Sequence, residues 1–214
     1  GKTDRFIAHL DINCFYAAVQ MLLEPGLRHV PLAICGSEED RHGIVLTANY
    51  IAKKQYHIKT GMTAREARGL CKKLVCRPPN GKQILRFSAK ARNIVARYTD
   101  RIESFGLDEM WFDLTGIAKN FDEAMAIVTE ISDTVKFELG ITVSIGLSFN
   151  KIYAKLGSDY KKPDAITRID RDNYQDIVFP LPASDLLYVG PKTTYKLMLE
   201  GINTSGELAS AEVA

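Results

Sequence analysis

Residues 101–114 read RIESFGLDEMWFDL, and this stretch decides the fold because it predicts a hairpin of two strands interrupted near Gly106. Outward from the hairpin, the hydrophobic periodicity predicts helices at residues 83–98 and 121–139 and strands at residues 5–11 and 141–147. A shorter helix, residues 14–23, follows the first strand. Strand, helix, hairpin, helix and strand in this order predict an α+β fold with a βαββαβ sheet.

A segment inserted after the first helix interrupts this order. It contains two predicted strands, residues 31–35 and 44–47, joined by a polar turn at residues 37–43, and two predicted helices, residues 48–55 and 63–71. The pair Pro78-Pro79 marks its end. Beyond the second half of the sheet, residues 150–161 predict a basic helix that Pro163 ends, and short helical pieces follow from residue 170.

The composition of the 214 residues is that of an ordinary globular protein, with 46% hydrophobic and 25% charged residues. It argues against disorder, collagen and coiled coil, and no apolar run approaches the roughly 18 to 20 residues that a membrane helix needs. The four cysteines lack C-x-x-C spacing. We therefore expect reduced thiols in the cytoplasm rather than a zinc site or a disulfide framework.

The charges are segregated along the chain, although the net charge is only +2. Residues 41–101 contain 15 Lys or Arg and two acids, a local charge of +13, whereas the remaining residues carry −11. A solvated surface usually mixes its signs, so this segregation favours a polyanionic partner such as nucleic acid or a nucleotide. The charge alone does not identify the polyanion.

Three carboxylates lie where the pattern predicts buried strands. Asp11 ends an apolar strand, and Asp108 and Glu109 lie in a run whose other members favour burial. Taken singly, Asp11 could cap the following helix and Glu109 could face water. Taken together, three acids on adjacent strands would repel one another unless a cation neutralised them, and oxygen-only ligands suit Mg²⁺. Two such ions, roughly 3.5 to 4 Å apart, can activate an attacking hydroxyl and stabilise a leaving pyrophosphate.

Two segments offer donors for phosphate groups. Residues 47–54 supply the hydroxyl of Thr47, and helical spacing places Tyr50 and Lys53 on one face. The basic helix supplies further charges at i, i+4 and i+7, namely Lys155, Asp159 and Lys162. Each lysine alone could equally be a solvated side chain, so this interpretation depends on their occurring together.

An aromatic pair, Phe15-Tyr16, follows Asp11 in the chain. An aromatic side chain there could stack under a sugar and exclude a 2′-hydroxyl. At the start of a helix, the same pair could equally belong to the hydrophobic core.

These residues form four motifs that resemble those of the Y-family (translesion) DNA polymerases, in the family's order. DINCFYAAV at residues 11–19 resembles the first motif, and TANYIAKK at residues 47–54 resembles the fingers motif. RYTDRIESFGLDEMWFDLT at residues 97–115 is similar to the second acidic motif, and SFNKIYAKLGSDYKKP at residues 148–163 to the final palm motif. The similarity is greatest to the DNA polymerase IV (DinB-like) branch.

The resemblance implies a role for each matching residue. The catalytic carboxylates, which would hold two Mg²⁺ ions together with the backbone carbonyl of Ile12, are Asp11, Asp108 and Glu109. The steric gate against ribonucleotides would be Tyr16, with Phe15 beneath the incoming sugar. The triphosphate would be held by Thr47, Tyr50, Lys53 and Lys162.

The resemblance also implies domains, an activity and partners. The expected domains are a ferredoxin-like palm (residues 1–24 and 79–169), small fingers (25–78) and part of a helical thumb (170–214), with a little-finger domain beyond this chain. The expected activity is template-directed addition of deoxynucleotides to a primer 3′-hydroxyl, in low-fidelity translesion synthesis during DNA repair and the SOS response. The expected partners of this monomer are primer–template DNA, a deoxynucleoside triphosphate and, through a more C-terminal region, a sliding clamp.

Several residues depart from the family pattern. Lys53 stands where Arg is common, so a bidentate phosphate contact becomes a point charge. Gln20 replaces a frequent Glu, Gly106 replaces the usual Ser, and Met110-Trp111 are bulkier than usual. Residues 187–191 match a helix-hairpin-helix only partly, because its first Gly is absent. These departures leave the acids intact but affect the expected rate, the template pocket and the capture of a DNA phosphate.

Two other functions are compatible with this fold. The chain could be a catalytically inactive accessory protein that binds DNA or a polymerase, although all three acids are present. A nucleotidyl cyclase with the same palm is disfavoured by Tyr16 and by the fingers motif. The polymerase interpretation requires Asp11 to meet the Asp108-Glu109 pair, and it excludes the pairing of either end with a lysine in a closed core.

Overall fold

The computed structural model describes residues 3–37 and 43–211, so most of the turn predicted at residues 37–43 lies outside the described residues. The chain forms two compact units. The first unit comprises Gly1–Asp11, Val95–Thr134 and Thr142–Ala214, and the second comprises Ile12–Ile94 and Val135–Ile141. Each unit is described by itself.

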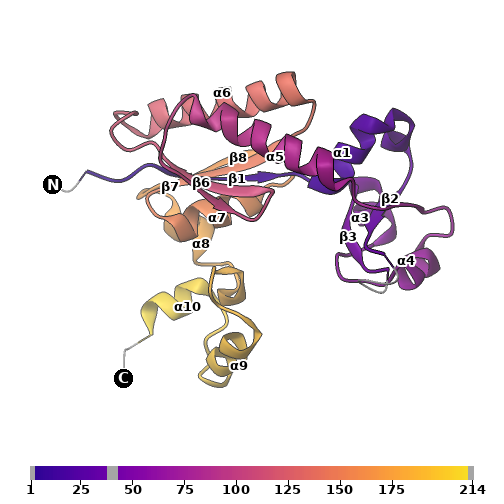
Figure 1. Cartoon of the computed structure of the whole chain (residues 1–214). Coiled ribbons are helices and arrows are strands. Elements are labelled where there is room, and N and C mark those ends of the chain that lie inside the picture. Colours follow the sequence, from indigo (N-terminus) through magenta and orange to yellow (C-terminus); the bar gives the residue numbers. More distant parts are fainter. Residues whose placement is uncertain (1–2, 38–42, 212–214) are drawn as a thin grey trace. The chain divides into compact units, whose positions relative to one another are not determined.

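The first unit is built on a five-stranded sheet of order β5-β6-β1-β7-β8 (Figure 1). The strands are β1 (Ile7–Ile12), β5 (Ile102–Phe105), β6 (Glu109–Asp113), β7 (Val143–Ser148) and β8 (Ile166–Ile169). The predicted hairpin is the antiparallel pair β5–β6, and β6 also pairs antiparallel with β1. Without β8, this is the order of the predicted ferredoxin-like βαββαβ sheet.

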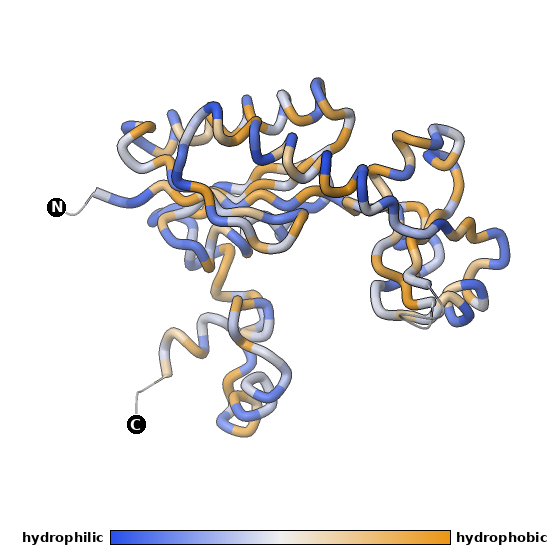
Figure 2. The backbone as a smooth tube through the Cα atoms, in the orientation of Figure 1, coloured by the Kyte–Doolittle hydropathy of each residue, from blue (hydrophilic) through white to orange (hydrophobic). Residues whose placement is uncertain are grey.

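The sheet is covered by helices on both faces (Figure 1). One face carries α6 (Phe121–Leu139), which begins and ends where the sequence predicts, and the other carries α7 (Lys151–Tyr160). The central strands β1 and β7 are buried at every position, which is why they are predominantly hydrophobic (Figure 2). Helix α7 lies very close to β7: a Cβ atom on Gly146 would be 1.8 Å from the carbonyl oxygen of Ala154.

Short helices follow β8 in the first unit: α8 (Tyr174–Val178), the 3₁₀ helix η2 (Ala183–Asp185), α9 (Pro191–Leu199) and α10 (Ser205–Ser210). A cluster of aromatic rings links α7 to α8, with Tyr153 and Tyr174 stacked at 6.1 Å. The partial helix-hairpin-helix precedes α9. There Tyr188 has a φ of 70°, in the left-handed region that glycine normally occupies.

The second unit contains a three-stranded sheet of order β3-β2-β4. Its elements are α1 (Phe15–Leu23), η1 (Pro25–His29), β2 (Leu32–Cys35), β3 (Val45–Ala48), α3 (Tyr50–Tyr56), α4 (Ala64–Leu70), β4 (Val75–Arg77) and most of α5 (Gly81–Ala96). Asn49 links β2 to the start of α3: its side-chain oxygen accepts hydrogen bonds from the backbone N–H groups of Leu32 and Ala52, and its amide donates to the carbonyl oxygen of Val30. Gln20 donates to Glu24, which also binds Arg77 of β4.

Two strands were not predicted from the sequence, β4 and β8. Both are parallel to their neighbours, β2 and β7 respectively. Both are also short, so their local sequence carries little alternation. Within the described residues, no helix combines the length and the apolar character that crossing a membrane requires.

Candidate active site

The three predicted carboxylates meet at one end of neighbouring strands in the first unit. In the antiparallel pair β1–β6, Asp11 lies directly opposite Glu109, and Asp108 immediately precedes β6. The turn into β6 uses Gly106 with a φ of 72°, which accounts for glycine at this position. The geometry therefore meets the requirement that Asp11 lie beside the Asp108-Glu109 pair.

Lysines from α7 and the segment after it are paired with two of these acids. Lys162 Nζ is bonded to Asp11 Oδ2 and lies 2.8 Å from Asp159 Oδ1, and Lys155 Nζ lies 2.6 Å from Glu109 Oε1. The pairs are partly exposed: the side chains of Lys162 and Lys155 are 32% and 22% exposed, and those of Asp11 and Glu109 are 10% and 19% exposed. Neither pair is therefore sealed from solvent, as it would be in a closed core. A lysine ammonium on a flexible, partly solvated stem can yield its carboxylate to a competing cation.

The acids influence one another's protonation. Burial, followed by the negative charges of Asp11 and Glu109, raises the pKa of Asp108 to about 6. Burial also raises the pKa of Asp11, although its lysine partner acts in the opposite direction. Burial alone would raise the pKa of Glu109, but the contacts with His9 and Lys155 outweigh it and lower the pKa to about 2. The three acids therefore differ: the pKa of Asp108 and that of Asp11 are raised, mainly by burial, whereas that of Glu109 is lowered.

The donor set suits a divalent cation, although the side chains are not arranged around one. Across residues 3–37 and 43–211, no three His, Cys, Asp or Glu side chains converge in a way that could hold a metal ion. The donors are carboxylate oxygens, which Mg²⁺ prefers. The raised pKa of Asp108 reflects burial first and then repulsion by Asp11 and Glu109, and a bound cation relieves this repulsion. In this arrangement the two lysines neutralise part of the charge that the cations would otherwise neutralise.

His9 belongs to this site but was not singled out from the sequence. Its side chain is fully buried, with Nδ1 2.7 Å from Ser158 Oγ and Nε2 3.3 Å from Glu109 Oε1. The alternation of a strand was an available signal, because residues two apart, such as His9 and Asp11, share a face. Lys155 was noticed only for its helical spacing, without the contact to Glu109.

The other predicted residues belong to the second unit. The ring centroid of Tyr50 lies 5.1 Å from Lys53 Nζ, so these two side chains share a face as their spacing predicts. Thr47 lies in β3. At the start of α1, the ring centroids of Phe15 and Tyr16 are 5.8 Å apart, and Phe15 is buried. Their roles towards a nucleotide remain predictions.

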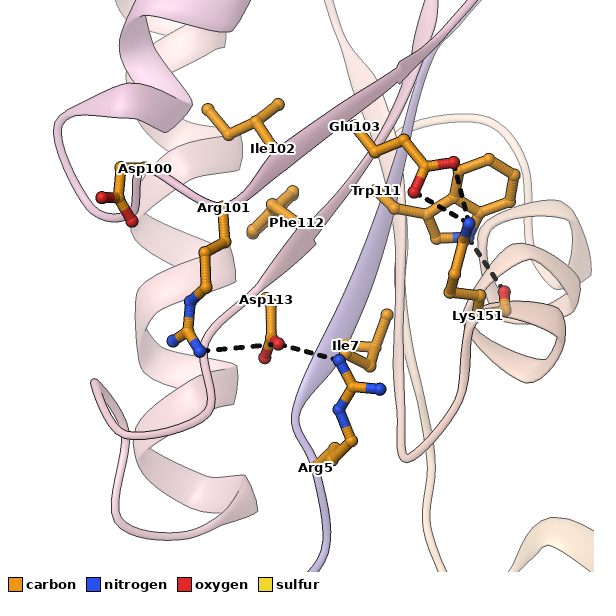
Figure 3. A pocket seen from close by; sticks show the side chains of 10 residues that line it. All are labelled: Arg5, Ile7, Asp100, Arg101, Ile102, Glu103, Trp111, Phe112, Asp113 and Lys151. Carbon is orange, nitrogen blue, oxygen red and sulfur yellow. Dashed lines mark hydrogen bonds and ion pairs between the residues drawn. The ribbon is translucent and has the colours of Figure 1, made fainter.

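A hollow of about 360 Å³ lies elsewhere on the first unit (Figure 3). It is lined by Arg5, Ile7, Asp100, Arg101, Ile102, Glu103, Trp111, Phe112, Asp113 and Lys151. Asp113 is paired with Arg5 at 3.0 Å and Arg101 at 3.6 Å, and Glu103 with Lys151 at 2.8 Å. The predicted site residues do not line this hollow, and many of its charges are mutually compensated.

Comparison with known proteins agrees with the motifs. Residues 10–159 match the model of the impB/mucB/samB family. DNA polymerase IV of Acetivibrio thermocellus is 50% identical over 206 residues, and DNA polymerase IV of Moorella thermoacetica is 39% identical over 212 residues. These matches cover 96% and 99% of this chain but 51% and 53% of the two relatives. The chain thus spans about half the length of the curated relatives it matches.

Solved structures give the same result for the fold. The insertion ternary complex of Dbh DNA polymerase matches with a TM-score of 0.89 at 27% identity, and the Y-family DNA polymerase chimera Dbh-Dpo4(243-245)-Dbh with 0.89 at 26%. Each match covers 97% of this chain and 61% of the other. The resemblance to Y-family polymerases and the α+β fold predicted from the sequence are therefore confirmed. Since the family model matches well over half of its residues, this chain belongs to the impB/mucB/samB family.

Proposed function

We propose that this chain carries the catalytic centre of a template-directed DNA polymerase that extends a primer 3′-hydroxyl in low-fidelity translesion synthesis. The observation that carries the proposal is the placement of Asp11 directly opposite Glu109 in strands β1 and β6, with Asp108 immediately before β6. The names of the relatives support it. Because the chain spans only part of those relatives, the activity of the whole protein belongs to the proposal.

The carboxylates would act by holding two Mg²⁺ ions. Asp11, Asp108, Glu109 and the backbone carbonyl of Ile12 would supply the protein ligands. Ions held by these ligands would supply a lower pKa for the primer hydroxyl and would neutralise charge on the departing pyrophosphate. Lys162 and Lys155 would release the acids as the ions bind, and Lys162 would then be free to pair with a phosphate group.

The incoming nucleotide would be bound by the residues to which the family motifs assign this role. The phosphate-binding side chains would be Thr47, Tyr50, Lys53 and Lys162. Lys53 would act as a single point charge, so it would hold the triphosphate less rigidly than an arginine. Tyr16 would exclude a 2′-hydroxyl, with Phe15 beneath the sugar.

The partners of the proposed enzyme are primer–template DNA and a deoxynucleoside triphosphate, and a sliding clamp would bind a more C-terminal region. The ternary complexes among the similar structures support the first two partners. The domain boundaries, the monomeric state and the cytoplasmic location stay predictions. No observation favours the inactive accessory protein, since the chain retains all three acids.

The test is single-nucleotide primer extension by the variant Asp108→Asn, which removes one charge and keeps the shape of the side chain. We expect loss of extension with retention of the fold by circular dichroism. Asp133→Asn, at an exposed position on α6, is the matched control and should extend normally. Extension by Asp108→Asn at a rate near that of the unaltered chain would refute the assignment.

If primer extension by this chain is slow, nucleotide binding distinguishes the proposed polymerase from the inactive accessory protein. We expect a deoxynucleoside triphosphate to raise the melting temperature in Mg²⁺ but not in EDTA, and Asp108→Asn to abolish the shift. The ribonucleoside triphosphate should give a smaller shift if Tyr16 is the gate. A shift that is independent of both Mg²⁺ and Asp108 would contradict a metal-dependent nucleotide site.

A further inference from the structure

The contacts of His9 are unusual for a core histidine. The side chain has no exposed surface and lies within β1, two residues before Asp11. Its Nδ1 is 2.7 Å from Ser158 Oγ on α7. Its Nε2 is buried and, among the described residues, makes no hydrogen bond of good geometry; Glu109 Oε1, 3.3 Å away, is the carboxylate oxygen that it faces. A buried polar atom without a hydrogen bond destabilises the fold, so its presence in a native structure calls for an explanation such as a functional role.

The contact with Glu109 has a definite direction. An ionised carboxylate can only accept, so the contact is attractive when the proton lies on Nε2. In that tautomer Nδ1 accepts from the hydroxyl of Ser158, which then donates to His9 rather than to the carbonyl oxygen of Lys155, 2.7 Å away. Both nitrogen donors at Glu109, from His9 and from Lys155, meet the same oxygen, Oε1. The two contacts hold Oε1 in place, and among the contacts of the described residues none is made to Oε2.

The imidazole is itself held on two sides. Ser158 fixes its Nδ1 edge from α7. The indole of Trp111 packs edge-on against it, with ring centroids 5.0 Å apart. Trp111 is anchored in turn, because its Nε1 donates to the carbonyl oxygen of Lys151 at 2.9 Å and Lys151 Nζ lies 4.4 Å from its ring (Figure 3). His9 therefore has little freedom to turn away from Glu109.

We propose that His9 is a positioning residue, which orients the Glu109 carboxylate for a divalent cation. The inference rests on the proposed function, because it takes Glu109 to be a cation ligand. In this proposal Nε2 contacts the Glu109 carboxylate, and Ser158 and Trp111 hold the imidazole ring in place. Groups that hydrogen-bond a metal-binding carboxylate typically alter metal affinity by about 10- to 100-fold when removed.

Two substitutions of His9 distinguish a positioning role towards Glu109 from a role in core packing alone. In Gln the amide nitrogen falls near the place of Nε2, so His9→Gln can still donate to Glu109. In Asn it falls near the place of Nδ1, so His9→Asn keeps a polar side chain of similar size but cannot reach Glu109. His29→Asn, on an exposed histidine in η1, serves as the control for loss of an imidazole.

The readout is the binding of Tb³⁺, a luminescent oxygen-seeking cation, measured on this chain without nucleotide. Trp111 is the only tryptophan of the chain and packs against His9, so indole excitation should sensitise Tb³⁺ held at the carboxylates. We expect His9→Asn to weaken Tb³⁺ binding about 10-fold or more. We expect His9→Gln and His29→Asn to bind nearly as well as the unaltered chain.

The outcomes distinguish this inference from the proposed function. Equal binding by the Asn and Gln variants, or unchanged binding in His9→Asn, would overturn the positioning role alone. If the unaltered chain gives no sensitised emission, or gives emission that Asp108→Asn leaves unchanged, the cation site itself fails. Should His9→Asn unfold, the comparison of His9→Gln with His9→Phe, which fills the space without a donor, decides the question in the same way.

Discussion

Asp108 illustrates how a single residue links stability to function. Its pKa is raised to about 6 by burial and by the charges of Asp11 and Glu109. The ionised form, which prevails at neutral pH, therefore has a higher free energy in the folded chain than in the unfolded chain. A carboxyl with a raised pKa stabilises the fold in its protonated form. That stability is fully present below the ordinary value of 3.8 and is lost as the pH rises through about 6.

We therefore expect Asp108→Asn, which cannot ionise, to be more stable than the unaltered chain above pH 6 in the absence of divalent cations. The gain should be on the order of 1–2 kcal/mol, because solvent screening at a half-buried carboxyl reduces the nominal 1.4 kcal/mol per pKa unit. It should vanish as the pH falls towards 4. Urea unfolding in EDTA at several pH values measures this, and a destabilised variant at pH 8 would contradict the account.

The site was partly predictable at the scale of residues. Strand ends and the odd setting of the acids were enough to expect that Asp11 would meet Asp108 and Glu109. The pairing with lysines was not predictable, because it depends on where α7 lies against the sheet. The same holds for His9, whose partner Ser158 is 149 positions away in the chain.

At the scale of elements, the close approach of α7 to β7 depends on Gly146. A Cβ atom there would lie 1.8 Å from the carbonyl oxygen of Ala154 and 2.5 Å from the amide nitrogen of Ser158, and neither backbone atom can move without displacing the helix. We expect Gly146→Ala to lower the free energy of unfolding by about 3 kcal/mol or more, at or above the upper end of ordinary overpacking. Since Ser158 contacts His9, cation binding should weaken too.

Gly69→Ala is the matched control for this prediction. Gly69 lies in α4 with open space where a Cβ would be, so alanine should be neutral or stabilise the chain by up to about 1 kcal/mol. Urea unfolding of both variants gives the comparison. Equal effects of the two substitutions would mean that α7 and β7 are not packed as described.

Tyr188 provides a second element-scale prediction. It lies within the partial match to a helix-hairpin-helix, has a left-handed φ of 70° and is 82% exposed. A non-glycine residue in this conformation costs roughly 1 kcal/mol or more. We expect Tyr188→Gly to stabilise the chain, whereas Tyr195→Gly, on an exposed face within α9, should destabilise it by about 1 kcal/mol. Thermal melts that show the same sign for both would contradict this.

A helix or strand was predicted accurately where its own residues carry the pattern, and it was missed where it depends on pairing with a distant segment. Helix α6 was predicted to the residue because 19 residues of amphipathic sequence precede a terminating Gly140. Strands β4 and β8 were missed because each is three or four residues long and forms only by pairing with a distant parallel strand. Such pairing is decided by tertiary structure rather than by the segment itself.

At the scale of the whole molecule, the separation of charge predicts how the chain would bind DNA, its proposed partner. A segment of charge +13 within a chain of net charge +2 should bind duplex DNA mainly through phosphates. We expect the affinity to fall roughly 40-fold between 50 and 200 mM salt if three phosphates are contacted. Fluorescence anisotropy with labelled DNA measures the slope, and affinity that is insensitive to salt would argue against a polyanion partner.

The central claim is that Asp11, Asp108 and Glu109 share divalent cations. The most direct measurement is anomalous diffraction from crystals of the chain soaked with Mn²⁺ and a deoxynucleoside triphosphate. The account predicts Mn²⁺ peaks within bonding distance of these carboxylates, with Lys155 and Lys162 withdrawn from them. Lysines that still hold Glu109 and Asp11 at saturating Mn²⁺, with no peak between the strands, would contradict it.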